Sequence, residues 1–337
     1  MFSSSIHLSS LDEQMIGPIV SIFSSRCYRP VTIFRMLVRF SRFWYRIRGR
    51  KLAFDSKRFE EAAWVARFNE TKSGRYDKSI ELVIVSTSKD FDILPDSINY
   101  ALRALKPYNI SGARVIVPSR DVSSCQKLLL DCEGEVEIID ESDLISQKHF
   151  KKLTEVFGNR NTWVLQQLLK VQGVLKSKSD AVLILDSDTV LLRPRPWFSP
   201  VGNQILMPSM EYNESYYQFL AKLHISELVP KYSFISHHML MQPKILSNLL
   251  DSLDLLEIEK FITYICDNAD TKVQSPICIE YELYGQHLFE TEPKGYFLER
   301  WSNISISRRY SNTILKSKLA KSTLRIFYNS VSFHSWS

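Results

Sequence analysis

The chain of 337 residues is 45% hydrophobic and 12% aromatic, which is enough apolar material to bury a sizeable core in one large domain or two ordinary ones. It contains only 10 Gly and 13 Pro and no internal repeat, which excludes collagen-like, solenoid and low-complexity proteins. The formal net charge of +6 is modest, but the basic excess is concentrated near the N-terminus.

The basic excess lies in residues 26–58, which hold eleven Lys or Arg and a single acidic residue, Asp55. Four arginines from Arg35 to Arg46 are spaced by four, three and four residues, so on a helix they share one face. A basic, aromatic-rich amphipathic helix suits an anionic membrane surface, which is the predicted partner of this segment. A helix packed on the following domain, with solvated arginines, is the alternative. No nucleic-acid-binding motif accompanies the charge, so nucleic acid is not an expected partner.

The cysteines and the N-terminus indicate the compartment. Five cysteines, with no pair separated by two residues, fit a reducing environment. No apolar run reaches the roughly 18 to 20 residues that a membrane-spanning helix needs. Asp12 and Glu13 precede the short apolar stretch 15–23, and basic residues follow it, which is the reverse of a secretory signal. We therefore expect a cytoplasmic protein, peripheral on the inner face of the plasma membrane.

From residue 80 onward, strand and helix patterns alternate. The predicted strands are 80–88, 114–118, 136–139 and 181–185, and the predicted helices are 95–105, 122–130 and 163–173, the last ended by Gly173. This alternation predicts a mainly parallel sheet covered by helices, with ligands at the carboxyl ends of its strands. Two such ends carry polar residues: Ser86, Thr87 and Asp92 are cofactor-binding candidates at the end of the first strand, and Asp186 to Asp188 follow the last.

Asp186 and Asp188 flank Ser187 directly after an apolar strand. Extended geometry would place both carboxylates on one side, with Ser187 pointing away. Two hard oxygen ligands suit Mn²⁺ or Mg²⁺, and such a cation would offset the charge of a diphosphate leaving group. Asp-x-Asp occurs by chance in a chain with 37 acidic residues, but its place after a buried strand favours a metal site.

Further stretches accompany this motif, and together they are more specific than any one alone. They are Trp163 with Gln166–Lys170, Leu183–Val190 with Arg193 and Pro194, Phe234–Met241, Glu280–Gly285 and Val331–Trp336. On these stretches the chain resembles GT-A glycosyltransferases, most closely a bacterial family of glycosyltransferase-like proteins associated with surface-polysaccharide genes.

The resemblance implies an α/β catalytic domain with the GT-A fold over residues 76–337, in which helices flank a mainly parallel central sheet. Residues 1–75 would form the separate basic segment. The implied activity is metal-dependent transfer of a sugar from a nucleotide-sugar donor, with UDP-linked donors favoured, to a glycan or lipid-linked acceptor in surface-polysaccharide synthesis. The implied cofactors are Mn²⁺ or Mg²⁺ and the nucleotide sugar.

The resemblance also implies roles for single residues. In retaining enzymes of the glycogenin-like kind, a C-terminal histidine completes the metal shell with both aspartates, and His334 holds the matching place beside Asp186 and Asp188. This sequence lacks the Gly-x-x-Lys-Pro-Trp ending of those enzymes, so a lysine contact to the diphosphate is missing there. Lys170 or another basic residue would replace it, and Lys170 and Asp186 are both candidates for binding the donor. An ordinary half-buried histidine and a solvated helix lysine are the alternatives.

The acceptor side offers two pairs of candidates. His237 and His238 are adjacent and would face opposite sides of a strand, so one is structural, and the resemblance favours His238 as the sugar contact. Glu280 and Glu282 are candidates for a carboxylate that binds the acceptor or acts as general base, and on a helix at most one of them enters the cleft. An inverting mechanism needs such a base, whereas the analogy of His334 favours retention.

Two other functions remain open. In haloacid-dehalogenase-like phosphatases, which share an Asp-x-Asp after an apolar strand, Asp186 would be the nucleophile and Asp188 the general acid. That motif normally lies on the first strand, whereas three predicted strands precede it here, and the later acidic residues Asp267 and Asp270 follow a helical stretch. The third function is a non-catalytic scaffold at a membrane surface.

Overall fold

The computed structural model describes residues 77–194, 196–199, 202–209, 213–269, 277, 279–292, 295–299 and 301–334. The predicted N-terminal segment 1–75, with its basic helix and its membrane contact at residues 26–58, lies outside the described residues. Within the described ranges, no helix combines the length and the apolar content that crossing a bilayer requires.

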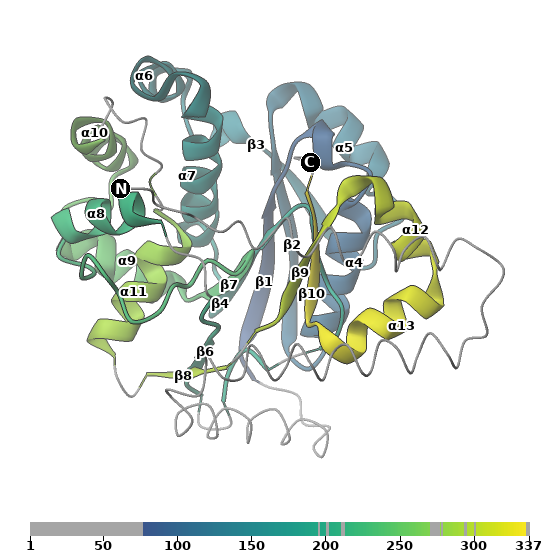
Figure 1. Cartoon of the computed structure of the whole chain (residues 1–337). Helices are drawn as coiled ribbons and strands as arrows, with labels where there is room; N and C mark the ends of the chain where they lie inside the picture. The colour runs from purple at the N-terminus through teal and green to yellow at the C-terminus, as the bar shows by residue number, and fades with distance from the viewer. Residues whose placement is uncertain are drawn as a thin grey trace, which may run out of the picture.

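A five-stranded sheet lies at the centre of the molecule (Figure 1). Four of its strands are parallel, and the fifth pairs antiparallel at one edge. The order is β3 (Val136–Asp140), β2 (Asn109–Val117), β1 (Ser79–Val85), β4 (Ala181–Asp186) and the antiparallel β7 (His238–Met241). The predicted α/β class, with a mainly parallel sheet flanked by helices, is confirmed.

Helices cover both faces of this sheet, which is why β1 and β4 are nearly continuous apolar runs. Leu82 and Ile84 pack in one core with α4, and Val83 and Val85 pack in the other with α7. In Figure 1, α4 and α5 lie on one side of the sheet and α6 and α7 on the other. The helices are α4 (Leu94–Leu105), α5 (Val122–Leu128), α6 (Gln147–Phe157), α7 (Asn161–Leu175), α8 (Glu214–Lys222), α9 (Pro243–Ser252), α10 (Ile258–Asn268), α11 (Tyr281–Thr291), α12 (Ser311–Lys316) and α13 (Lys318–Phe327).

Gly173 lies inside α7, so the prediction that it ends this helix was wrong. The helix continues to Leu175. A Cβ at Gly173 would lie 2.9 Å from Val83 Cγ1 and 3.2 Å from Ile116 Cδ1. The missing side chain therefore lets α7 pack directly on the sheet, and it brings Lys170, one turn earlier, close to the end of β4.

A second sheet is assembled from distant parts of the chain. Its strands lie in the order β5 (Thr189–Leu191), β10 (Ser330–His334) and β9 (Asn303–Ser307). β10 is antiparallel to β5 and parallel to β9. Because β5 begins directly after Asp188, this pairing brings the late strand that carries His334 to the Asp-Ser-Asp motif. A further two-stranded sheet joins β6 (Gln204–Leu206) and β8 (Tyr296–Leu298).

The packing of α11 can be tested at Gly285, where a Cβ would lie 2.7 Å from three side-chain carbons of the buried Phe234. Overpacking a filled core costs about 1–3 kcal/mol, and the better helix propensity of alanine offsets roughly 1 kcal/mol, so we expect Gly285→Ala to lower the free energy of unfolding in urea by about 1–2 kcal/mol. Glu290→Ala, at an exposed position on the same helix, is the control and should change stability by less than about 0.5 kcal/mol. Equal stability of the two variants would contradict the close packing of α11.

Candidate active site

A buried ammonium group lies between two carboxylates at the carboxyl end of β4. Lys170 Nζ is 2.6 Å from Asp186 Oδ1 and 3.0 Å from the Glu280 carboxylate. Tyr281 Oη is 3.3 Å from Lys170 Nζ, and this hydroxyl donates to Asp186 Oδ1 at 2.8 Å. The Lys170 side chain is only 3% exposed. Since an ammonium has three N–H donors, all three have acceptors within the protein.

The charges of this cluster depend on one another. Burial alone would lower the pKa of Lys170, but the charges of Asp186 and Glu280 outweigh it and hold the pKa above its usual value. Burial would likewise raise the pKa of Asp186, but Lys170 and His237 hold it well below its usual range. Burial raises the pKa of Glu280, against the opposing charge of Lys170. The cluster therefore contains a firmly ionised aspartate and a glutamate with increased proton affinity.

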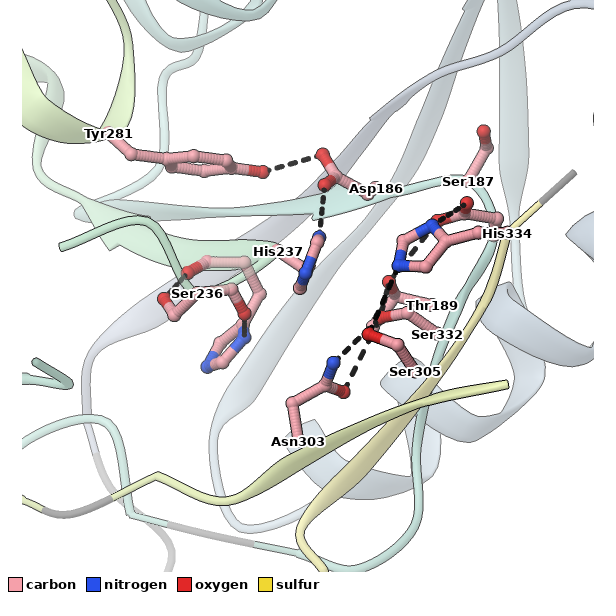
Figure 2. Close-up of polar contacts among 12 residues, drawn as sticks. Asp186, Ser187, Thr189, Ser236, His237, Tyr281, Asn303, Ser305, Ser332 and His334 are labelled. Carbon is pink, nitrogen blue, oxygen red and sulfur yellow. Dashed lines mark hydrogen bonds and ion pairs between the residues drawn. The ribbon is translucent and has the colours of Figure 1, made fainter. Parts of the chain in front are cut away.

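Each aspartate of the Asp-Ser-Asp motif faces a histidine. His237 Nδ1 lies 3.1 Å from Asp186 Oδ2, and His334 Nδ1 lies 3.2 Å from Asp188 Oδ2. The centroids of the two imidazole rings are 5.3 Å apart. Figure 2 shows the Asp186 carboxylate joined to His237 and to Tyr281, and the His334 ring on β10. Two carboxylates and two imidazoles thus come together from the ends of β4 and β10 and from the residue before β7.

His237 reaches Asp186 through an unusual backbone conformation. Its φ of 61° lies in the left-handed region, which costs a residue other than glycine about 1–2 kcal/mol. The conformation is held by a hydrogen bond from Asp186 N to His237 O at 2.9 Å. Strained residues of this kind cluster at functional sites, and this one aims an imidazole at the aspartate.

A row of polar side chains holds His334 from the other side (Figure 2). Its Nε2 lies 3.2 Å from Ser305 Oγ on β9. Beneath it, the hydroxyls of Thr189 and Ser332 are 2.7 Å apart, and Asn303 Nδ2 donates to Ser332 Oγ at 3.1 Å. A partner on the second ring nitrogen fixes the orientation of an imidazole and hence the direction of the first nitrogen.

The middle residue of the motif holds the loop after β1. Ser187 Oγ donates to Asp90 Oδ2 at 2.6 Å, and Arg308 Nη2 donates to Asp90 Oδ1 at 2.7 Å. Ser97 Oγ donates to the backbone oxygen of Ser187 at 3.0 Å. The predicted orientation of Ser187, away from the two carboxylates, is therefore observed. Asp90 joins the loop after β1, the Asp-Ser-Asp motif and the segment after β9.

The side chains here have the chemistry of a divalent-cation site. Carboxylate and imidazole are suitable ligands for Mn²⁺. Two ligands at right angles on an ion, each about 2.1 Å from it, lie about 3.0 Å apart, close to the two observed Asp–His separations. Within the described ranges, no three His, Cys, Asp or Glu side chains converge on one point. The donor types suit such an ion, and in this structure both Asp–His separations are those of hydrogen bonds.

Sequence comparison assigns the family. Residues 84–304 match the model of a family of unknown function (DUF6492). The chain belongs to this family. The matched range includes Lys170, Asp186, His237 and Glu280 and ends within β9, so His334 lies beyond it. No curated protein matches the chain by sequence.

Solved structures with a similar arrangement include three glycosyltransferases, the class that the sequence resembles. Mouse xyloside xylosyltransferase 1 aligns at 13% identity and a TM-score of 0.41, over 76% of this chain and 98% of that one. The galactosyltransferase LgtC aligns at 12% identity and a TM-score of 0.38, over 76% of this chain and 87% of that one. The bifunctional glycosyltransferase WbbM aligns at 12% identity and a TM-score of 0.42, over 78% of this chain but only 46% of the WbbM chain. Because these TM-scores lie below 0.5, the chemistry of the DUF6492 site is inferred from its own side chains.

Of the two candidate glutamates, only Glu280 enters the Lys170 cluster. Glu282 is fully buried, and its Oε1 accepts hydrogen bonds from Tyr217 Oη, Ser233 Oγ and Phe234 N. Its Oε2 accepts from Gln286 Nε2 at 2.7 Å. Glu282 therefore fastens α11 to α8 and to the segment before β7, and it is a structural residue.

His238 lies in the interior, on the side opposite to His237. Its ring is 1% exposed and packs 4.1 Å from the Trp301 ring and 5.5 Å from the Trp197 ring, measured between centroids. Burial lowers the pKa of His238 to about 3, so the ring is neutral. The sequence favoured His238 as the sugar contact, but the structure brings His237 to the site instead, because the left-handed turn directs the two rings apart.

Ser86, Thr87 and Asp92 lie at the carboxyl end of β1, where the sequence placed them. Ser86 is buried, and its N–H donates to Ile116 O at 2.9 Å. The Asp92 carboxylate is 3.4 Å from Arg308 Nε. These residues share the loop that Asp90 ties to the Asp-Ser-Asp motif, and their contact with a nucleotide stays a prediction.

The phosphatase alternative requires a second acidic pair at the end of a strand. Asp267 lies within α10, and Asp270 lies outside the described residues. The strand that carries Asp186 follows three other strands of its sheet in the chain. Neither observation matches the arrangement that this alternative needs.

Four residues that the structure brings to the site had no predicted role: Tyr281, Ser305, Asp90 and Arg308. Tyr281 lies in the quoted stretch Glu280–Gly285, adjacent to Glu280. Asp90 and Arg308 are 218 residues apart, so no local pattern could have paired them.

The buried cluster can be tested through Lys170. Lys170→Met leaves Asp186 and Glu280 without their cation, and breaking a buried ion pair in this way costs about 3–5 kcal/mol of stability. The double variant Lys170→Met with Glu280→Gln removes one of the two stranded charges and should recover part of that loss in chemical denaturation. A double variant as unstable as the single one would show that the carboxylates do not depend on Lys170.

The backbone strain at His237 predicts an unusual order of stabilities. His237→Ala and His237→Gly both remove the imidazole, but only glycine adopts a positive φ without a steric cost. We expect the glycine variant to be more stable than the alanine variant by about 1 kcal/mol in urea denaturation. At ordinary positions in regular structure the alanine variant is the more stable of the two. An alanine variant more stable than the glycine variant at His237 would therefore contradict the left-handed turn.

Proposed function

We propose that the chain transfers a sugar from a nucleotide-diphosphate sugar, with UDP-linked donors favoured, to a hydroxyl of a glycan or lipid-linked acceptor. The observation that carries the proposal is the pairing of Asp186 with His237 and of Asp188 with His334 at the carboxyl end of a central parallel strand. Phosphate-bearing ligands bind at such strand ends in open α/β sheets. A cytoplasmic role in surface-polysaccharide synthesis belongs to the proposal through the sequence resemblance.

Asp186, Asp188 and His334 would hold Mn²⁺ or Mg²⁺. When bound, the cation would neutralise, as a Lewis acid, the negative charge that develops on the departing diphosphate. Ser305 keeps the His334 ring oriented, and Lys170 keeps Asp186 ionised. Ser187 holds the loop after β1 against the motif through Asp90, so the proposed nucleotide loop and the proposed cation ligands are positioned together.

Glu280 is the residue that we propose meets the acceptor hydroxyl. Lys170 Nζ lies 3.0 Å from both of its oxygens and donates to Oε1, while Oε2 is buried and accepts no hydrogen bond within the described residues. A buried carboxylate of increased proton affinity, with one oxygen that accepts no hydrogen bond, can orient an acceptor hydroxyl, and it can take the proton in an inverting reaction. Retention, the stereochemical course favoured by the resemblance at His334, requires only the orienting role.

Titration calorimetry with UDP and Mn²⁺ tests the donor site. We expect the wild-type chain to bind, and we expect Asp188→Ala to weaken binding by roughly 100-fold or more because it removes a ligand of the bridging cation. Asp251→Ala, at an exposed position on α9, should bind like the wild type. A wild-type chain that binds no nucleoside diphosphate would contradict the proposed function. A clear preference for GDP or CMP would overturn the choice of UDP.

Glu280→Gln tests the acceptor side once a hydrolysable donor has been found by screening nucleotide sugars with Mn²⁺. A group that transfers or orients a proton contributes about 10²- to 10⁴-fold, so kcat should fall by that factor while the KM for the donor stays nearly unchanged. Glu290→Gln on the exposed side of α11 is the control and should retain full activity. An unchanged kcat in Glu280→Gln would remove Glu280 from the mechanism, and an increased donor KM would assign it to the donor side.

A further inference from the structure

The C-terminal part of the chain is basic and has no acidic residue of its own. From Arg300 to Ser337 the sequence contains seven Lys or Arg and neither Asp nor Glu. Arg308 is paired with Asp90 in the site, and Lys321 lies close to Asp96 and to the Tyr100 ring. The other described cations of this part, Arg309, Lys316, Lys318 and Arg325, are all exposed.

Helix α13 is amphipathic but buries almost none of its apolar residues. Within it only Ala320 is buried, while Leu319 and Ile326 are 55% and 53% exposed. Leu319 and Ile326 are seven residues apart, so they lie two turns apart on one face of the helix. Lys318 and Arg325 are exposed directly beside them, again seven residues apart. This face therefore carries two aliphatic side chains flanked by two cations.

Among the described residues, this face of α13 is accessible. In Figure 1, α13 lies beside α12, at the right of the view. Its inner side meets the small core beneath β9 and β10 through Leu324. The side with Leu319 and Ile326 is the opposite one.

The size of this face decides what it can bind. A stable protein partner needs about 800 Å² of surface on each side, more than one face of a ten-residue helix about 15 Å long provides. A lipid bilayer needs only a few inserted apolar side chains with cations beside them. The positive charge selects anionic headgroups.

We propose that α13 docks the protein on a membrane that contains anionic lipids. Leu319 and Ile326 enter between the headgroups, and Lys318 and Arg325 contact the lipid phosphates. This contact is separate from the one predicted for residues 26–58, and it does not depend on the proposed enzymatic function.

The test is sedimentation of the full chain with vesicles of phosphatidylcholine alone or mixed with phosphatidylglycerol. Each cation near the headgroups raises the partition coefficient about fivefold, so Lys318→Gln with Arg325→Gln should lower binding to the anionic vesicles by about 25-fold. Leu319→Ser with Ile326→Ser should lower it by at least about tenfold. The matched controls are Lys148→Gln with Lys151→Gln and Leu228→Ser with Val229→Ser, which change equally exposed residues elsewhere.

The expected result is binding to anionic vesicles only, lost in both α13 variants and kept in both controls. Absence of binding by the wild-type chain would overturn the proposal. If the α13 variants bind the anionic vesicles as strongly as the wild-type chain does, the proposal is overturned as well. The membrane contact would then belong to another segment, such as residues 26–58. An altered oligomeric state of the α13 variants in size-exclusion chromatography would instead make this face a contact between copies of the chain. Thermal unfolding of every variant shows whether a loss of binding reflects a loss of folding.

Discussion

One buried ammonium group holds the site together. Lys170 joins α7 to Asp186, 16 residues further along the chain, and to Glu280, 110 residues away. A buried charge without its partner costs several kcal/mol, so the helix, the strand end and the start of α11 can only pack where all three groups meet. Gly173 allows this approach, because α7 would otherwise collide with Val83. The same contact keeps Asp186 ionised, so the packing of the fold and the chemistry of the motif depend on one interaction.

Local sequence patterns predicted the central sheet but not the second one. β1 and β4 are apolar runs bounded by polar residues, and such runs identify buried parallel strands without knowledge of their neighbours. The sheet of β5, β10 and β9 depends on the pairing of Ser332 with Thr189 and Ser305, which are far away in the chain. The helix stop assigned to Gly173 failed for the same reason, since the glycine serves a contact with another element and not a local turn.

The candidate site was predictable where a residue type and its place on a strand determine the role. Asp186 and Asp188 were identified in this way and His334 through the resemblance to GT-A glycosyltransferases, and the structure brings Asp188 and His334 together. The choice between His237 and His238 depended on a single positive φ, which no residue pattern reveals for a histidine. Glu280 and Glu282 are two residues apart, and only the position of α11 turns one toward Lys170 and the other into the core.

The charges of the cluster also explain why the proposed function needs a cation. Asp186 and Glu280 share one ammonium, Asp188 faces His334, and the three N–H groups of Lys170 already point at Asp186, Glu280 and Tyr281. The sequence suggested that Lys170 replaces a missing lysine contact to the diphosphate, but in this arrangement it has no donor left to offer. Arg308 is likewise committed to Asp90. A nucleotide diphosphate would therefore approach a surface of its own sign, and like charges at close range repel strongly where water is partly excluded. An ion held by the aspartates and His334 would reverse the sign of that surface, so in this proposal the acidic motif binds phosphate only through the ion.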